Sequence, residues 1–217
     1  MSLNLMYHNI VLDDSKIESE YDITVRQLEN DIAIVSSSDS KYTTFTFDDG
    51  KKGSLIAAKM LKKYNMQGIF FIITNKISEP GYIDIKEINE IHRMGHIIGS
   101  HSHTHPNFKK ISDDEVTFEL FRSKEILDNL ISQKVTKFAF PGGQRKTHHS
   151  KIALELGYTE IYNSIEKISY PKQVEQTRFH IRQSNRGCVK KIIMLQKSYL
   201  LKRYLRSVLV EMRSTLQ

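Results

Sequence analysis

Residues 43–50 read TTFTFDDG, a run of β-favouring residues that ends on two adjacent carboxylates and a glycine. The β-branched and aromatic side chains predict a strand, and Gly50 permits a sharp turn after it. Asp48 and Asp49 repel each other unless a cation lies nearby or one of them is protonated. An Asp-Asp-Gly tripeptide by itself is more often a simple turn. A functional interpretation therefore needs a partner motif.

Residues 101–105, HSHTH, supply that partner after the apolar run HIIGS at 96–100. The spacing of His101 and His105 places two imidazoles on one side of a helical turn and within reach of one ion, whereas His103 points elsewhere. A His-rich loop alone is usually solvated. Together with Asp49, however, the pair makes two imidazoles and one carboxylate, and three protein ligands leave positions for water and substrate.

Short apolar segments alternate with helical patterns along the chain, which is typical of β-α units around a largely parallel sheet or barrel. Capping boxes at Ser112 and Asp84 predict two helix starts, and Gly95 and Gly157 predict helix ends. The candidate functional residues follow predicted strands, where the catalytic groups of parallel β/α folds gather. The predicted strands are 3–7, 43–47, 68–73, 96–100, 137–140 and 179–181.

Length and composition indicate one domain spanning residues 1–217, because 217 residues with 39% hydrophobic side chains can bury one substantial core. The single Cys188 excludes an internal disulfide and a cysteine-held structural zinc. The apolar run at the start is too short for a signal peptide or a membrane span. We therefore expect a cytoplasmic protein, unless a leader has been removed ahead of Met1.

The formal net charge of +7 is concentrated in the tail. Residues 189–217 contain seven Lys and Arg residues against Glu211 alone, so the rest of the chain is nearly neutral and no nucleic-acid-binding face is expected. Apolar residues at helical spacing predict a basic amphipathic helix over 189–217. Packing against the barrel is its default role, and contact with a membrane surface or an anionic glycan is the alternative.

These motifs resemble those of the polysaccharide deacetylases with a NodB homology domain, which form carbohydrate esterase family 4. Residues 46–50 (TFDDG) are similar to the first motif of that family and 101–105 (HSHTH) to the second, while 138–143 (FAFPGG) resemble a variant of the third. The resemblance spans roughly Leu5 to Tyr162. It implies a distorted (β/α) barrel of about seven strands and removal of N-acetyl groups from a sugar of a polysaccharide or glycan precursor.

The resemblance also implies roles for individual residues. Asp49, His101 and His105 would hold a divalent metal, most commonly zinc, with cobalt or nickel as alternatives. Asp48 would be the general base that takes a proton from metal-bound water, the nucleophile. A backbone N–H in the turn formed by Pro141, Gly142 and Gly143 would help to hold the developing oxyanion.

Two departures from the family pattern leave alternatives open. The family's third motif usually starts with an arginine that contacts the base, whereas residues 137–139 read KFA, and Arg145 and Arg178 are both candidate substitutes. The late Leu-x-x-His motif that supplies the general acid has no clear match, and His180 is the nearest late candidate. Residues 5–10 (LMYHNI) resemble the opening strand of the poly-N-acetylglucosamine deacetylase subgroup, so His8 ranks above His180 as the acid.

The remaining histidines have no carboxylate partner nearby in sequence and are interpreted as structural or solvated; they are His92, His96, His148 and His149. Two other functions stay open beside the deacetylase: a non-catalytic carbohydrate-binding module, and a related hydrolase of another amide or of an O-acetyl ester. The sequence specifies neither the sugar, nor the native metal, nor the oligomeric state.

Overall fold

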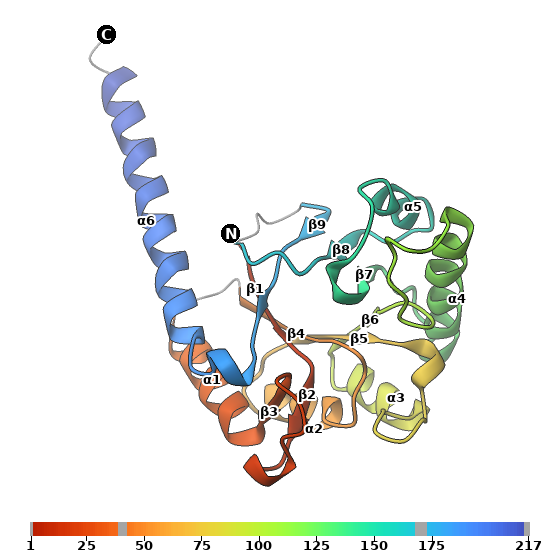
Figure 1. The fold of residues 1–217 in the computed structure, drawn as a ribbon. Coiled ribbons are helices and arrows are strands. Elements are labelled where there is room, and N and C mark those ends of the chain that lie inside the picture. Colours follow the sequence, from red (N-terminus) through yellow and green to blue (C-terminus); the bar gives the residue numbers. More distant parts are fainter. Residues whose placement is uncertain (1, 39–42, 168–172, 215–217) are drawn as a thin grey trace.

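The computed structural model describes residues 2–38, 43–167 and 173–214. A parallel eight-stranded sheet forms its centre, in the order β10-β1-β4-β5-β6-β7-β8-β9, and it curls with helices around its outside (Figure 1). The strands of the sheet are β1 (Leu3–Tyr7), β4 (Thr43–Phe47), β5 (Gly68–Ile72), β6 (Ile97–Ser100), β7 (Lys137–Ala139), β8 (Glu160–Tyr162), β9 (Glu175–Gln176) and β10 (Phe179–His180).

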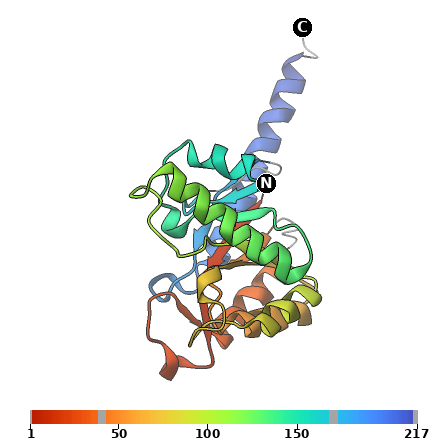
Figure 2. The same ribbon diagram turned by 90° about the vertical axis from the view of Figure 1, so that its right-hand side faces the viewer.

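A second, two-stranded parallel sheet lies beside the first and joins β2 (Asn9–Val11) to β3 (Asp22–Thr24). Figure 2 shows the helical outer wall of the molecule, with α4 crossing the front of that view. The helices are α1 (Val25–Ser37), α2 (Ser54–Lys63), α3 (Ile85–Arg93), α4 (Asp113–Ile131), α5 (His149–Glu155) and α6 (Val189–Ser214).

The predicted (β/α) barrel is confirmed, and each of the predicted strands agrees with an observed one to within a residue at either end. The predicted number of about seven strands is one too low, because β9 is two residues long and carries no recognisable strand pattern. Both predicted capping boxes are present, at Ser112 before α4 and at Asp84 before α3. Each satisfies backbone N–H groups that the first turn of a helix leaves without partners.

The two edges of the sheet are joined by one continuous segment of chain. β9 pairs with β8 at one edge and β10 pairs with β1 at the other, yet only Thr177 and Arg178 separate β9 from β10. Asn4 on β1 donates from Nδ2 to the Thr177 carbonyl oxygen over 2.9 Å. This bent segment closes the barrel by joining the two edges of the sheet, and it places Arg178 between them.

The strand register aligns the carboxyl ends of the central strands. Tyr7 pairs with Phe47, Phe47 with Phe70, and Ile72 with Ser100. The side chains of β1 are all buried, as expected for a strand of a parallel sheet that is covered on both faces. The residues that follow these strands therefore emerge together at one rim of the barrel.

The first turns of α6 pack against the body and the helix then extends away from it, as both ribbon views show (Figures 1 and 2). Val189, Ile192 and Ile193 are buried, and α6 contacts α1. Farther along, Leu195 and Leu201 are about 60% exposed. The predicted helix is thus confirmed up to Ser214, and its last three predicted residues lie outside the described part of the chain. Among the described residues, no helix is both long and apolar enough to cross a bilayer.

Candidate functional site

Asp49, His101 and His105 meet at the carboxyl rim of the barrel. The Oδ1 atom of Asp49 lies 3.6 Å from Nε2 of His101 and 3.6 Å from Nε2 of His105. Asp49 follows β4 and His101 follows β6, so two strand ends supply the cluster. Asp49 and Gly50 adopt φ of 73° and 68°, a left-handed turn that folds the chain back at the rim.

The two histidines converge through an irregular loop and not through the helical turn that their spacing suggested. Residues 101–105 form no helix, and Ser102 and His105 have φ of 69° and 64°. Glu119 of α4 anchors this loop, since its Oε2 accepts hydrogen bonds of 2.8 Å from the backbone N–H groups of His103 and Thr104. Sequence reasoning missed Glu119, although an acid beside the apolar Leu120 on the predicted helix face was a signal.

The His101 imidazole is oriented for metal binding before any ion is present. Its Nδ1 lies 2.7 Å from the carbonyl oxygen of Ala139 and must therefore carry the proton. The lone pair of Nε2 then faces the carboxylates of Asp48 and Asp49. Burial lowers the pKa of His101, which favours the neutral, ligating form.

The three ligand atoms fit a zinc-class ion. Each lies within 4.8 Å of the other two, and bonds of about 2.0–2.1 Å to a tetrahedral zinc would place them about 3.3 Å apart. The two separations of 3.6 Å between Asp49 and the histidines thus need only a small contraction. Two imidazole nitrogens and one carboxylate oxygen are also a donor set that divalent transition metals accept.

Asp48 lies beside this cluster but is held by a different partner. Its Oδ1 is 2.6 Å from an Nη atom of Arg178, while its Oδ2 is 3.7 Å from His101 Nε2. Burial by itself would raise the pKa of Asp48, but the charges of Arg178, His101 and His8 hold that pKa well below its ordinary value. Asp48 is therefore an ionised carboxylate that is 2% exposed.

The structure selects Arg178 over Arg145 as the substitute for the family arginine. The Arg178 side chain is fully buried, donates from Nε to the Asn163 carbonyl oxygen over 3.1 Å, and stacks 5.4 Å above the Phe71 ring. Arg145 instead pairs with Glu175 at 2.6 Å. The choice could not be made from sequence, because Arg178 reaches Asp48 only through the closure of the barrel.

His8 and His180 occupy different environments near the rim. Among the described residues, Nδ1 of His8 is buried without a hydrogen-bond partner, and its ring lies 4.6 Å from the Tyr21 ring. Burial lowers the pKa of His8, whereas the charges of Asp48 and Asp49 raise it. In His180, Nδ1 accepts from Arg182 at 3.0 Å, and burial followed by the Arg182 charge lowers the pKa to about 4. His180 is therefore neutral at pH 7.

The turn expected to hold the oxyanion follows β7 and contains two left-handed residues. Gly142 and Gly143 have φ of 56° and 66°. Pro141 has no N–H, and the N–H of Gly143 donates to the Phe140 carbonyl oxygen over 2.9 Å. Of the three residues in this turn, Gly142 is thus the one with an N–H left to offer to a substrate.

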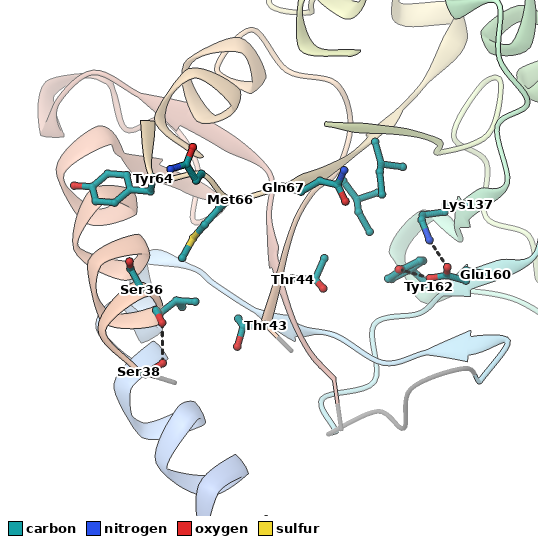
Figure 3. Close-up of a pocket in the computed structure, with 14 residues that line it drawn as sticks. Ser36, Ser38, Thr43, Thr44, Tyr64, Met66, Gln67, Lys137, Glu160 and Tyr162 are labelled. Atoms are coloured by element: carbon teal, nitrogen blue, oxygen red, sulfur yellow. Dashed lines mark hydrogen bonds and ion pairs between the residues drawn. The ribbon is translucent and has the colours of Figure 1, made fainter. Parts of the chain in front are cut away.

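A cavity of about 620 Å³ opens at the opposite end of the barrel (Figure 3). Thr44, Lys137 and Glu160, which lie at or near the amino ends of their strands, line it, and Lys137 pairs with Glu160 there. Ligand sites of parallel β/α folds form at the carboxyl ends of the strands. We therefore place the functional site at the Asp48 rim and not in this cavity.

The other histidines divide into two groups. The structural interpretation of His96 is confirmed, since its Nδ1 accepts from the Gly68 N–H at 3.1 Å and its Nε2 lies 2.9 Å from the Ala58 carbonyl oxygen. His148 and His149 do have a carboxylate partner, Asp113, which lies far away in sequence. Neighbouring sequence could not reveal this partner, because Asp113 belongs to a different helix, α4.

Comparison with known proteins points to one family. A family profile described as polysaccharide deacetylase matches residues 36–161. A peptidoglycan-N-acetylglucosamine deacetylase of Bacillus cereus is 27% identical over 127 residues, which cover 58% of this chain and 45% of that protein. The putative polysaccharide deacetylase YxkH of Bacillus subtilis is 29% identical over 119 residues, or 54% and 43% of the two chains. The chain thus matches less than half the length of these relatives.

Solved structures share the fold at lower sequence identity. The Streptococcus pyogenes deacetylase PplD, in complex with acetate, aligns with a TM-score of 0.76 at 21% identity, covering 83% of this chain and 92% of PplD. IcaB from Ammonifex degensii aligns with a TM-score of 0.78 at 17% identity, covering 88% and 96%. These likenesses identify the barrel as one of the NodB type.

Proposed function

Because the chain belongs to the polysaccharide deacetylase family, we propose that it removes N-acetyl groups from N-acetylglucosamine residues of a polysaccharide, using a bound divalent metal. The observation that carries this proposal is the position of Asp48, a buried, ionised carboxylate beside a metal-ligand triad of which it is not a member. The name of the Bacillus cereus relative supports N-acetylglucosamine as the sugar.

The side chains divide into binding and proton-transfer groups. Asp49, His101 and His105 would hold the metal, which would acidify a water molecule and polarise the acetyl carbonyl as a Lewis acid. Asp48 would accept the proton of the attacking water through Oδ2, because Arg178 occupies Oδ1. Since Arg178 also makes Asp48 a weak base, the site needs an acidified water.

The remaining steps use groups from other strand ends. The Gly142 N–H is directed to the developing oxyanion, because the Gly143 N–H is already donated within the turn. His8, beside the Asp48 and Asp49 carboxylates, protonates the departing amine. His180 is less suited to this role, because its Nδ1 already accepts a hydrogen bond from Arg182, whereas Nδ1 of His8 has no partner among the described residues.

A non-catalytic carbohydrate-binding role would leave the buried, ionised Asp48 carboxylate unexplained. Burying an ionised carboxylate costs free energy unless it is paired, and here Arg178 maintains Asp48 in that form right beside the metal ligands. Binding a neutral sugar needs no such group. An O-acetyl ester hydrolase would use the same residues, so substrate assays must separate the two hydrolases.

The test joins metal analysis to acetate release. Wild type, Asp48→Asn and His101→Ala are assayed on N-acetylglucosamine oligomers and peptidoglycan, with an O-acetylated glycan as the ester control. Asp48→Asn should retain the metal and lose about 10²–10⁴-fold in rate, whereas His101→Ala should lose both the metal and the activity. The proposal fails if the metal-loaded wild type releases no acetate from any N-acetylated glycan, or if Asp48→Asn is as active as wild type.

A further inference from the structure

A second group of potential metal ligands lies apart from the Asp49 triad. Asp113 is the first residue of α4, and His148 and His149 stand at the start of α5. Asp113 Oδ1 lies 3.0 Å from His148 Nε2 and 3.4 Å from His149 Nε2. One potential ligand atom from each of the three residues lies within 4.8 Å of the other two, as in the triad of Asp49, His101 and His105.

His149 is the unusual member of this group. It is 0% exposed, and among the described residues its Nε2 has no hydrogen-bond partner of acceptable geometry. Leaving a buried polar atom unpaired costs roughly 1–3 kcal/mol. A cation between Nε2 and the Asp113 carboxylate would give this atom a partner.

We propose that Asp113, His148 and His149 bind a second divalent transition-metal ion. The donor set is again two imidazole nitrogens and one carboxylate oxygen, which suits zinc, nickel, cobalt or copper and is too nitrogen-rich for magnesium or calcium. Asp113 and His148 are each about half exposed, so an ion can enter from solvent and keep water ligands. The proposal does not depend on the deacetylase activity.

The second site should bind its ion more weakly than the triad of Asp49, His101 and His105. In the triad, Nδ1 of His101 donates to a carbonyl oxygen and leaves Nε2 free to ligate. In His149, by contrast, Nδ1 accepts from the Lys146 N–H over 3.4 Å, an arrangement that places the ring proton on Nε2. That long hydrogen bond must be given up before Nε2 can bind a metal.

An ion at this position would connect two segments of the catalytic rim. α4 follows the loop that carries His101 and His105 and anchors it through Glu119, while α5 follows the turn that contains Gly142. Phe108, in the connection between His105 and α4, packs its ring against His149 and Phe140. Joining α4 to α5 would therefore stiffen both active-site loops without contacting the substrate.

The experiment counts zinc ions on untagged, chelator-treated full-length protein by calorimetric titration with Zn²⁺. Wild type should bind two ions of different affinity. Asp113→Asn and His148→Ala, both surface changes, should each lose the weaker ion only, and His101→Ala should lose the stronger one only. Asp114→Asn, which changes the neighbouring exposed carboxylate, is the matched control and should bind two ions.

Thermal unfolding supplies a second measurement. Zinc beyond one equivalent should raise the melting temperature of wild type and Asp114→Asn but not that of Asp113→Asn or His148→Ala. A single zinc ion on wild type would overturn the proposal. So would a second ion that persists in both Asp113→Asn and His148→Ala, because it would then lie elsewhere.

Discussion

Asp48 and Arg178 are 130 positions apart in sequence and form a fully buried ion pair with an oxygen–nitrogen distance of 2.6 Å. Desolvating both groups is costly, and the pair is supported by additional contacts from Arg178 to Asn163 and Thr46. Removing one partner would leave the other charge buried and unpaired. The proposed base thus owes its ionisation to a residue outside its own motif.

Replacing Arg178 should therefore change both pH dependence and stability. In Arg178→Gln the pKa of Asp48 should rise, because the charge that lowers it is gone. The acidic limb of the kcat/KM profile should then move to higher pH, and the free energy of unfolding should fall by about 3–5 kcal/mol. Arg145→Gln, which removes the partner of the 40% exposed Glu175, should leave the acidic limb in place. If the acidic limb does not move in Arg178→Gln, Arg178 does not set the pKa of Asp48.

The two candidate acids can be separated by single substitutions. His8→Ala should reduce kcat by about 10²-fold or more with metal content unchanged, because the departing amine loses its proton donor. His180→Ala should have a much smaller effect, since Nδ1 of His180 is already engaged by Arg182. Steady-state kinetics of both variants on the same oligomer measure this. Equal losses in the two variants, or a larger loss in His180→Ala, would remove His8 from the acid role.

At the scale of elements, strands and helix starts are determined by local sequence patterns, whereas the shape of a loop depends on the residues that pack against it. The loop of residues 101–105 takes its shape from Glu119 of α4 and from left-handed backbone at Ser102 and His105. The four-residue spacing of the histidines predicted that their side chains converge, but through a helical turn that residues 101–105 do not form. Convergence comes from this anchored loop.

The Pro141–Gly143 turn allows a matched comparison of two glycines. Both have positive φ, so alanine at either position should cost about 1–2 kcal/mol in backbone strain. A Cβ at Gly143 would also lie 2.9 Å from Ser164 Cβ, whereas one at Gly142 would meet nothing closer than 3.7 Å. Chemical denaturation should therefore show Gly143→Ala to be clearly less stable than Gly142→Ala. Equal stability would mean that the turn relaxes away from Ser164.

At the scale of the whole molecule, the two-residue link between β9 and β10 joins both edges of the sheet and carries Arg178 into the barrel. The described side chains of α6 that are buried lie no farther along the chain than Gln196, and the helix then extends from the body (Figure 1). The single domain of residues 1–217 and the cytoplasmic location stay predictions.

Removing residues 202–217 should accordingly leave the barrel intact. The melting temperature should change by less than about 2–4 °C, the equivalent of 1 kcal/mol for a chain of this size. Removing residues 189–217 should lower it much more, because Val189, Ile192 and Ile193 are buried. Calorimetry of the two truncated chains measures this difference, and similar melting temperatures for both would show that α6 contributes nothing to the core.

The same truncation tests the alternative role of α6, a contact with a membrane surface. Residues 189–217 carry seven Lys and Arg residues against one glutamate, and Met194, Leu195 and Leu201 are exposed on α6. The full chain should sediment with vesicles that contain phosphatidylglycerol, less so at high salt, and not with purely zwitterionic vesicles. The chain that ends at Leu201 should bind them more weakly. Equal binding by both chains would assign any contact to another surface.

Local sequence was sufficient for six of the eight strands of the main sheet, the helix caps and the candidate metal ligands, because each of these depends on residues within a few positions of one another. Tertiary structure alone decided that Arg178 and not Arg145 pairs with Asp48, and that Asp113 lies beside His148 and His149. These contacts depend on how distant segments meet when the barrel closes. No short-range pattern encodes that closure.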